Sequence, residues 1–189
     1  MTARKNYAFA HLRGCLRSTT FVVVTILTAS AQGQVEEFQA KSAYLFNFAK
    51  FVEWPQQAFK TTNSPIRICV LGRDLFVKAL DETVSGKAVQ GRPFVVHQLS
   101  NPPSVIACHI LFVDASERKR FLTLVEELRV ASVLTVGEAP GFISDGGVIN
   151  LKTVNGRIAV EINVTAAERV NLRISSRLLS IARIVRVNP

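Results

Sequence analysis

The sequence predicts an α/β fold, a three-layer sandwich in which a Rossmann-like mixed sheet of about six strands is flanked by helices. Two observations carry this prediction. Short β-branched runs alternate with amphipathic segments between residues 66 and 136, which is typical of parallel strands joined by crossover helices. Further along, Gly146-Gly147 and Asn155-Gly156 are hairpin signals, which add antiparallel strands to the sheet.

The first 31 residues have the composition of a signal peptide. Four basic residues and no acidic one precede the apolar run from Phe21 to Leu27, and the small residues Ala29-Ser30-Ala31 follow it. This run is much shorter than the roughly twenty residues that span a bilayer. We therefore expect residues 1–31 to be removed on export to the periplasm, and residues 32–189 to form one domain without a membrane span.

The charge of the chain narrows the classes of partner. The formal net charge is +9, and it would fall to +5 without the four basic residues of the signal peptide. A modest positive excess on an exported domain suits an acidic protein partner or anionic lipid head groups, whereas nucleic acid is out of reach in that compartment. We expect no nucleic-acid partner.

The first element of the exported domain is a helix that starts at Val35 and stops at Trp54-Pro55. Its inward stripe has spacings of three, four and seven residues and consists of Phe38, Leu45, Ala49 and Val52. The helix carries more aromatic residues than this stripe needs. Phe46 flanks the stripe and is the best candidate for an exposed aromatic side chain.

The middle of the chain alternates strands with helices. Strands are predicted at Ile66–Leu71, Phe94–Val96, Ile110–Val113 and Val133–Val136. Asp74 is expected to cap a helix with Phe76, Ala79, Leu80 and Val84 inward, and Ser116 a helix with Phe121, Leu124, Val125 and Leu128 inward.

The last third predicts a half-buried strand and two helices. From Arg157 to Val164 the residues alternate, with Ile158, Val160, Ile162 and Val164 on a buried face and Arg157, Ala159, Glu161 and Asn163 on a polar one. Thr165 to Glu168 matches a capping box. Ser175 or Ser176 is expected to cap a last helix whose inner stripe is Leu178, Leu179, Ala182 and Val185.

Two cysteines remain after export, Cys69 and Cys108. An even pair in an oxidising compartment is more often a disulfide than two free thiols. With a strand order of 2-1-3, the strands at Ile66–Leu71 and Ile110–Val113 are neighbours, within reach of a disulfide bond. Two buried thiols are the alternative.

Motifs for catalysis or for cofactors are weak. The single glycine of Val70-Leu71-Gly72 lacks the partners of a dinucleotide or phosphate-binding loop, and no serine stands in a nucleophile elbow. His97 and His109 lie in or beside strands, without the close ligands of a metal site. We expect no enzyme activity, no cofactor and no metal.

Several ordered segments resemble the YfiR family. They cover nearly the whole exported chain: the run Ala43–Pro55, then Ile68–Gly72, Leu134–Gly137, Gly146–Asn150 and Ile174–Leu179. The resemblance implies a periplasmic repressor that binds the sensor region of an inner-membrane diguanylate cyclase, YfiN, and lowers cyclic di-GMP output, with effects on biofilm formation. It also implies a homodimer, and a structural disulfide at the positions of Cys69 and Cys108.

Five residues are candidates for contact with the partner. The segment Val160-Glu161-Ile162-Asn163 matches a conserved strand motif of the family, which points to Glu161 and Asn163. Leu151 is carried over from the same resemblance. Phe46 and Trp54 belong to the surplus aromatics of the first helix, and aromatic side chains are favoured anchors at interfaces.

Two other functions remain open. A periplasmic small-ligand-binding module, feeding another envelope sensor, would hold its ligand at the carboxyl ends of the strands, near Gly72, Asp114 and Gly137. An enzyme would need a cleft with titratable groups of perturbed pKa.

Overall fold

The computed structural model describes residues 18–99 and 108–187, with side chains from residue 33 onward. The chain divides into two compact units, residues 1–37 and residues 38–189. In the first unit, residues 18–37 are helical. Residues 1–17 of the predicted signal peptide, residues 1–31, lie outside the described residues. For residues 18–31 only the backbone is described. Its boundary stays a prediction.

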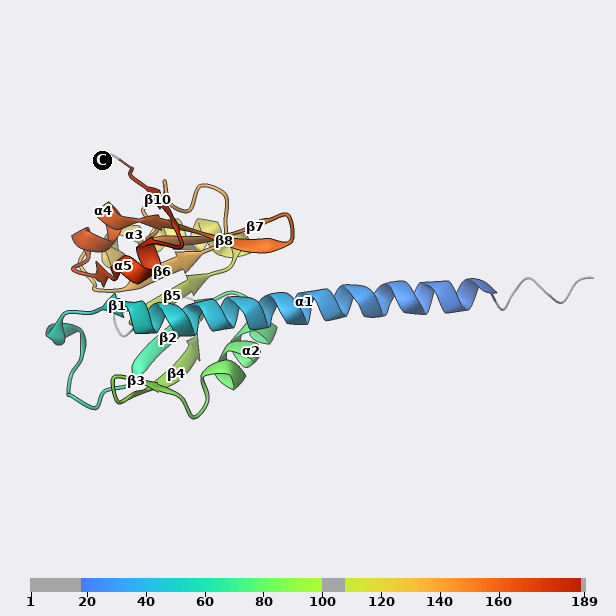
Figure 1. Cartoon of the computed structure of the whole chain (residues 1–189), viewed down its shortest axis with the longest axis horizontal. Helices are drawn as coiled ribbons and strands as arrows, with labels where there is room; N and C mark the ends of the chain where they lie inside the picture. Colours follow the sequence, from blue (N-terminus) through green and yellow to red (C-terminus); the bar gives the residue numbers. More distant parts are fainter. Residues whose placement is uncertain (1–17, 100–107, 188–189) are drawn as a thin grey trace, which may run out of the picture. The chain divides into compact units, whose positions relative to one another are not determined.

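Ten strands form two sheets in the described part of the chain. Eight of them, rather than about six, make one mixed sheet in the order β10-β8-β7-β6-β5-β2-β4-β3, which Figure 1 shows from β3 and β4 at the bottom to β10 at the top. Neighbours in this sheet pair in parallel, except β3 with β4 and β7 with β8. The other two strands, β1 and β9, form a small antiparallel pair. The strands are β1 (Val52–Glu53), β2 (Ile66–Leu71), β3 (Ala88–Val89), β4 (Arg92–Gln98), β5 (Ile110–Val113), β6 (Leu134–Gly137), β7 (Ile149–Val154), β8 (Arg157–Asn163), β9 (Arg173–Ile174) and β10 (Arg183–Val185).

Helices cover both faces of the large sheet, so the predicted three-layer sandwich is confirmed. Residues of α1 from Phe38 onward and α2 pack on one face, and α3 packs on the other. Because both faces are covered, β2, β5 and β6 are buried over nearly their whole length. The helices are α1 (Ser18–Phe51), α2 (Asp74–Val84), α3 (Arg118–Leu128), α4 (Val164–Arg169) and α5 (Ser176–Leu179), with 3-10 turns η1 (Gln56–Ala58) and η2 (Ala115–Glu117). Within the described residues, no helix has the length and apolar character that a membrane span requires.

The stripe predicted for the first helix is confirmed. Phe38, Leu45, Ala49 and Val52 are all at most 4% exposed. The helix starts at Ser18 rather than at Val35, and it ends at Phe51, so Val52 lies just beyond it in β1. Pro55 follows, because proline cannot continue a helix.

Helix caps differ from the predicted ones in three places. Arg73, not Asp74, precedes α2, and Asp74 lies in the first turn of that helix. The Asp114 side chain, not Ser116, caps the 3-10 turn before α3. Asn163, not Thr165, caps α4, because its side chain accepts from the Ala166 N–H at 3.0 Å. Asx side chains at strand ends thus satisfy the first N–H groups of the following helix or turn.

The end of the chain departs from the prediction more strongly. Ser175 caps the last helix as expected, but α5 stops at Leu179, and the predicted stripe residue Val185 lies in β10, which pairs in parallel with β8. The hairpin at Asn155-Gly156 is confirmed, since both residues have positive φ, 50° and 73°. The hairpin expected at Gly146-Gly147 is wrong, because the strands on either side of it, β6 and β7, pair in parallel.

The disulfide predicted between Cys69 and Cys108 is present. β2 lies between β4 and β5, which is the predicted order 2-1-3, and the two Cα atoms are 5.8 Å apart. Both cysteines are buried on the α3 side of the sheet. The bridge therefore links two neighbouring strands at the centre of the fold.

Candidate functional site

A buried carboxylate held by two cations lies near one edge of the sheet. Glu161 of β8 is 6% exposed. Lys152 Nζ of β7 lies 2.9 Å from its Oε1 and 2.8 Å from its Oε2, and Arg183 Nη1 of β10 lies 3.0 Å from Oε1. We call these three residues the Glu161 cluster.

The strand pairing brings the cluster together. The Asn155-Gly156 turn sets the β7–β8 register so that Glu161 faces Asn150 and lies diagonally opposite Lys152 on the same face. β10 adds beside β8 with Arg183 directly opposite Glu161. The β7–β8 hairpin and the later strand β10 therefore place the Glu161 carboxylate between the basic side chains of Lys152 and Arg183.

Burial is unequal within the cluster. The Glu161 side chain is 8% exposed, whereas those of Lys152 and Arg183 are 43% and 76% exposed. Two positive charges face solvent above one buried negative charge, which leaves the surface of the cluster with a positive excess. Such a surface attracts an acidic partner and repels a basic one.

The polar face predicted for β8 is only partly open. Arg157 and Ala159 are exposed, but Glu161 and Asn163 are buried, the latter at 4%. The expectation of an open face is wrong at these two positions, because Lys152 and Arg183 cover Glu161, and Asn163 caps α4.

The other candidate residues lie elsewhere. Leu151 is 3% exposed and packs into the core on the α1 side of the sheet. Phe46 is half-buried, edge-to-face with Phe94 of β4 at 5.6 Å between ring centroids. Two lysines lie over the same ring, Lys50 at 4.2 Å and Lys87 at 4.8 Å.

Trp54 has a structural contact. Its Nε1–H donates to the His109 carbonyl oxygen at 3.2 Å, and its ring packs against the core. The indole therefore joins the segment after α1 to the start of β5.

The five candidate residues for partner contact do not lie on a single surface. Phe46 contacts β4, and Glu161 lies in β8, five strands away in the sheet order. At about 4.8 Å per strand, that separation is about 24 Å. The Glu161 cluster and Phe46 therefore belong to separate parts of the surface. The partner role of each residue remains a prediction.

The carboxyl ends of the central strands, where a small ligand was considered, are closely packed. A Cβ on Gly72 would lie 2.8 Å from the Cβ of Asp114, and one on Gly137 would lie 2.4 Å from the Phe142 ring. Arg73 pairs with Asp114 at 3.0 Å, and Lys41 of α1 pairs with Glu138. These contacts occupy the edge that such a ligand would need.

The Asp114 carboxylate accepts hydrogen bonds from Ser116 and Arg73 at this edge. Burial opposes its ionisation, but hydrogen bonds from the Ser116 side chain and backbone and from Arg73 outweigh that effect and hold the pKa of Asp114 below its ordinary value. The contacts of this carboxylate are those of a cap and an ion pair. In the described part of the chain, no three His, Cys, Asp or Glu residues are placed to hold a metal ion.

Sequence reasoning missed two of the three residues in the Glu161 cluster. Arg183 was expected in the last helix, where it would not have faced β8. Lys152 could have been predicted from the hairpin at Asn155-Gly156. The register of that hairpin places Asn150 opposite Glu161, and Lys152 lies two residues further along the same strand, on the same face.

Comparison with known proteins gives one match. A family model described as DUF4154, YfiR/HmsC-like, matches residues 38–183, most of the chain. The matched region includes every strand of the large sheet except the last residues of β10. A search of curated proteins found no match.

Proposed function

Because the chain belongs to the YfiR/HmsC-like family, whose members are periplasmic regulators of cyclic di-GMP signalling, we propose that it represses an inner-membrane diguanylate cyclase by binding the periplasmic sensor region of that enzyme. The family is regulatory rather than catalytic. The protein then lowers cyclic di-GMP output without acting on any substrate.

The Glu161 cluster supports this proposal most directly. The side chains of Lys152 and Arg183 are solvent-exposed, and both form ion pairs with the buried carboxylate of Glu161. Long basic side chains lose conformational entropy on binding, and an ion pair that already orders them reduces that loss. The cluster is therefore a pre-organised cationic surface that suits an acidic segment of the sensor.

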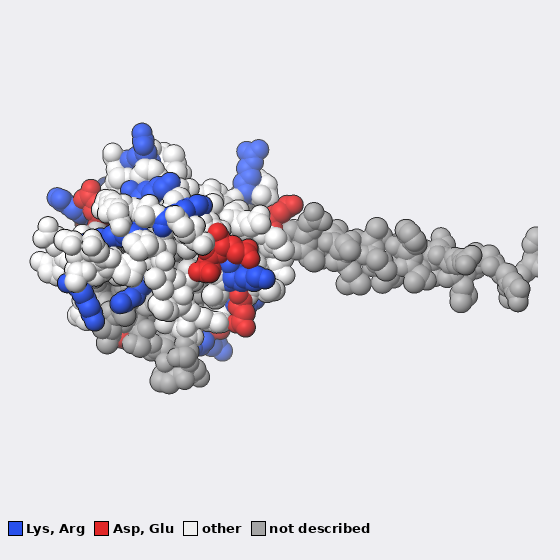
Figure 2. Space-filling view, turned by 90° about the horizontal axis from the view of Figure 1, so that it is seen from below, with Lys and Arg blue, Asp and Glu red and all other residues white. Residues whose placement is uncertain are grey.

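The wider surface is compatible with an acidic partner. Figure 2 looks at the molecule from the β3–β4 side, which is the opposite edge of the sheet from the Glu161 cluster. On this face too, lysines and arginines are spread over much of the surface, and acidic residues lie in a few smaller groups. Long-range attraction between such a surface and an acidic sensor speeds their encounter. The specific contact then depends on the ordered side chains of the cluster.

Repression requires a difference in affinity between two states of the sensor. A soluble regulator shifts its partner only as far as it binds the inactive state more tightly than the active one. Binding to an acidic segment that is exposed only in the inactive state supplies such a difference. The regulator acts as a homodimer, which would present the cluster twice to a dimeric sensor.

A capture experiment tests the proposal. The tagged protein is incubated with detergent-solubilised inner membrane, and captured proteins are identified by mass spectrometry. Arg183→Glu places a negative charge beside Glu161, and Arg177→Glu on α5 makes the same charge change outside the cluster. We expect wild type and Arg177→Glu to capture a diguanylate cyclase and Arg183→Glu to lose it while remaining folded.

The cellular readout follows the same variants. Cyclic di-GMP should rise in cells with Arg183→Glu and stay low with Arg177→Glu. Failure of the folded, oxidised wild-type protein to capture any cyclase would overturn the proposed partner. Equal capture by all three proteins would remove the Glu161 cluster from the interface.

A further inference from the structure

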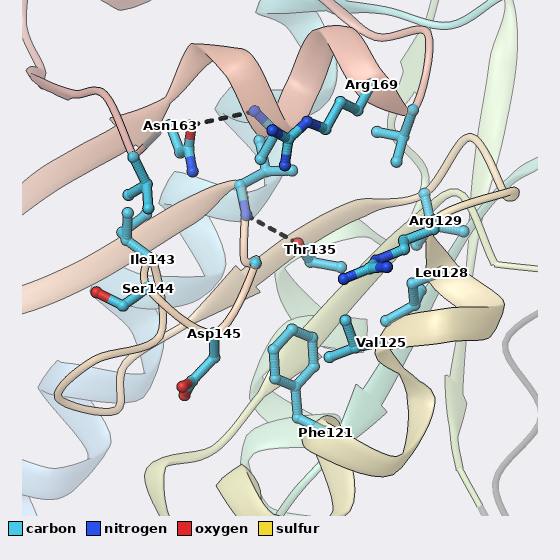
Figure 3. Close-up of a pocket in the computed structure, with 16 residues that line it drawn as sticks. Phe121, Val125, Leu128, Arg129, Thr135, Ile143, Ser144, Asp145, Asn163 and Arg169 are labelled. Atoms are coloured by element: carbon cyan, nitrogen blue, oxygen red, sulfur yellow. Dashed lines mark hydrogen bonds between the residues drawn. The ribbon is translucent and has the colours of Figure 1, made fainter. Parts of the chain in front are cut away.

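A pocket of about 690 Å³ opens beside α3, on the side of the sheet that carries the disulfide (Figure 3). Its walls come from α3, β6, the segment 143–146, and the start and end of α4. This volume is within the range that small organic ligands occupy. Neither Lys152 nor Arg183 lines it, but Asn163, two residues beyond Glu161 in β8, does.

One wall of the pocket is apolar. Phe121, Val125 and Leu128 lie at successive turns of α3 and present one continuous surface toward the pocket. Figure 3 shows these three side chains together along the helix. A wall of this kind binds the hydrocarbon part of a ligand and contributes affinity by removing it from water.

Asn163 supplies a hydrogen-bond donor in the wall of the pocket. Its Oδ1 accepts the Ala166 N–H at 3.0 Å, which fixes the orientation of the amide. The amide NH₂ group makes no hydrogen bond within the described residues, although the side chain lines the pocket and the residue is only 4% exposed. This group lines the pocket and can donate to a ligand or to water there.

Two arginines add positive charge to the same pocket. Figure 3 shows the guanidinium groups of Arg129 and Arg169 both pointing toward its middle. Arg129 pairs with Glu126 at 3.2 Å, but both side chains are well exposed and such surface pairs are weak. The side chain of Arg169 makes no ion pair or hydrogen bond within the part of the chain that the structure describes.

The acid in the pocket wall does not cancel this charge. Asp145 accepts two hydrogen bonds from Arg118, at 2.6 and 2.8 Å, and is therefore already neutralised. The pocket thus combines an apolar wall with three hydrogen-bond donor groups, the Asn163 amide and two guanidinium groups. Guanidinium groups bind carboxylates through paired hydrogen bonds.

From this combination we infer that the pocket is a binding site for an amphipathic small-molecule carboxylate, such as a medium-chain fatty acid. The hydrocarbon chain lies along α3, and the carboxylate accepts from Asn163 Nδ2 and Arg169, with Arg129 at the rim. This site goes beyond the proposed repression, since it assigns a ligand class to a pocket that Lys152 and Arg183 of the Glu161 cluster do not line.

The probe is sodium octanoate, with 1-octanol as the uncharged molecule of equal chain length. Binding to the full purified protein is measured by isothermal titration calorimetry and by the shift in Tm. We expect saturable binding of octanoate and at least tenfold weaker binding of octanol. Arg169→Ala should weaken octanoate at least tenfold, and Arg177→Ala, an exposed arginine outside the pocket, should leave it unchanged.

A second variant tests the apolar wall. Val125→Trp places a large side chain in the pocket and should abolish octanoate binding. Failure of wild type to bind octanoate at millimolar concentration would overturn the inference, and so would equal binding by wild type and Arg169→Ala. Equal affinity for octanoate and octanol would overturn the role of the charged groups. Since no cyclase is present, these outcomes are independent of the proposed repression.

Discussion

The Nδ1 atom of His109 accepts a hydrogen bond from the backbone N–H of Arg67 at 3.0 Å. The other ring nitrogen, Nε2, lies 3.0 Å from the Ala58 carbonyl oxygen and must donate to it. The ring is 5% exposed and stacks on Phe59 with 4.4 Å between centroids. Only a neutral imidazole protonated at Nε2 satisfies both contacts, so His109 is a structural residue.

Acid should destabilise the protein through His109. Burial, together with the charges of Arg67 and Arg92, lowers its pKa despite the opposing hydrogen bond to Ala58. The unfolded state therefore binds a proton first as the pH falls, and stability is lost from about pH 6.5 downward, until the folded state is protonated as well. Urea denaturation between pH 7.5 and 5 should show the free energy of unfolding decreasing.

Histidine variants separate this effect from other titrations. His109→Asn keeps an acceptor for Arg67 and should flatten the decrease in that pH range. His97→Asn changes an exposed histidine and should keep it. The same slope in wild type and His109→Asn would contradict the assignment.

Asp114→Asn should destabilise the protein by about 1–2 kcal/mol at pH 7, because the charged carboxylate accepts from both Ser116 and Arg73. The pKa of Asp114 is lowered, so its stabilising effect is present above the unfolded-state value near 4 and is lost as the pH falls through the folded-state value. The difference between wild type and variant should therefore shrink in strong acid. Asp81→Asn, an exposed acid, serves as the control and should change little.

The Cys69–Cys108 bridge should contribute about 4 kcal/mol by restricting the unfolded chain, given a sequence separation of 39 residues. Chemical denaturation with and without dithiothreitol measures this contribution. The Cys69→Ser, Cys108→Ser double variant should match the reduced wild type and should not respond to the reductant. A reductant effect that persists in the double variant would point to another cause.

Glu161→Gln should lower the free energy of unfolding by about 1–3 kcal/mol, since the buried amide pairs less strongly with Lys152 and Arg183 than the carboxylate does. The loss should be smaller at high salt, because the two cations are solvent-exposed. Thermal melts at low and high ionic strength give both quantities. Glu168→Gln, an exposed acid on α4, should show neither effect.

Gly137→Ala should destabilise the fold by about 1–3 kcal/mol, because the new Cβ would lie 2.4 Å from the Phe142 ring. Phe142→Ala is costly by itself, since it empties a fully buried site. The double variant should cost clearly less than the sum of the two single changes, as measured by urea denaturation. Additive effects would show that the two positions do not contact each other.

Much of the fold could be predicted because local sequence patterns determine where its strands and helices begin and end. The bounds of β2 and β5 were predicted correctly, since continuous apolar runs ended at Gly72 and Asp114. The strand order around β2 is the 2-1-3 order expected for a doubly wound sheet, and it places the two cysteines together. These features depend on residues close in sequence and on general rules of sheet connection.

The missed features depend on tertiary contacts. Residues 178–185 have helical spacing, but pairing with the exposed edge of β8 turns Arg183–Val185 into a strand. Glu161 lies on the polar side of an alternating strand, and it is buried between β7 and β10, which pair with β8 on either side and supply Lys152 and Arg183. The apolar spacing of α3 was predicted, but the pocket also needs α4 and the segment 143–146, which no local pattern brings together.

The strands at the two edges of the large sheet, β3 and β10, are both short. β3 has two residues and β10 has three, and β10 carries Arg183 with Arg186 just beyond it. Short, charged edge strands resist the edge-to-edge pairing through which sheets aggregate. The protein should therefore stay soluble at high concentration, and two copies that associate should do so through helices or loops rather than through one continuous sheet.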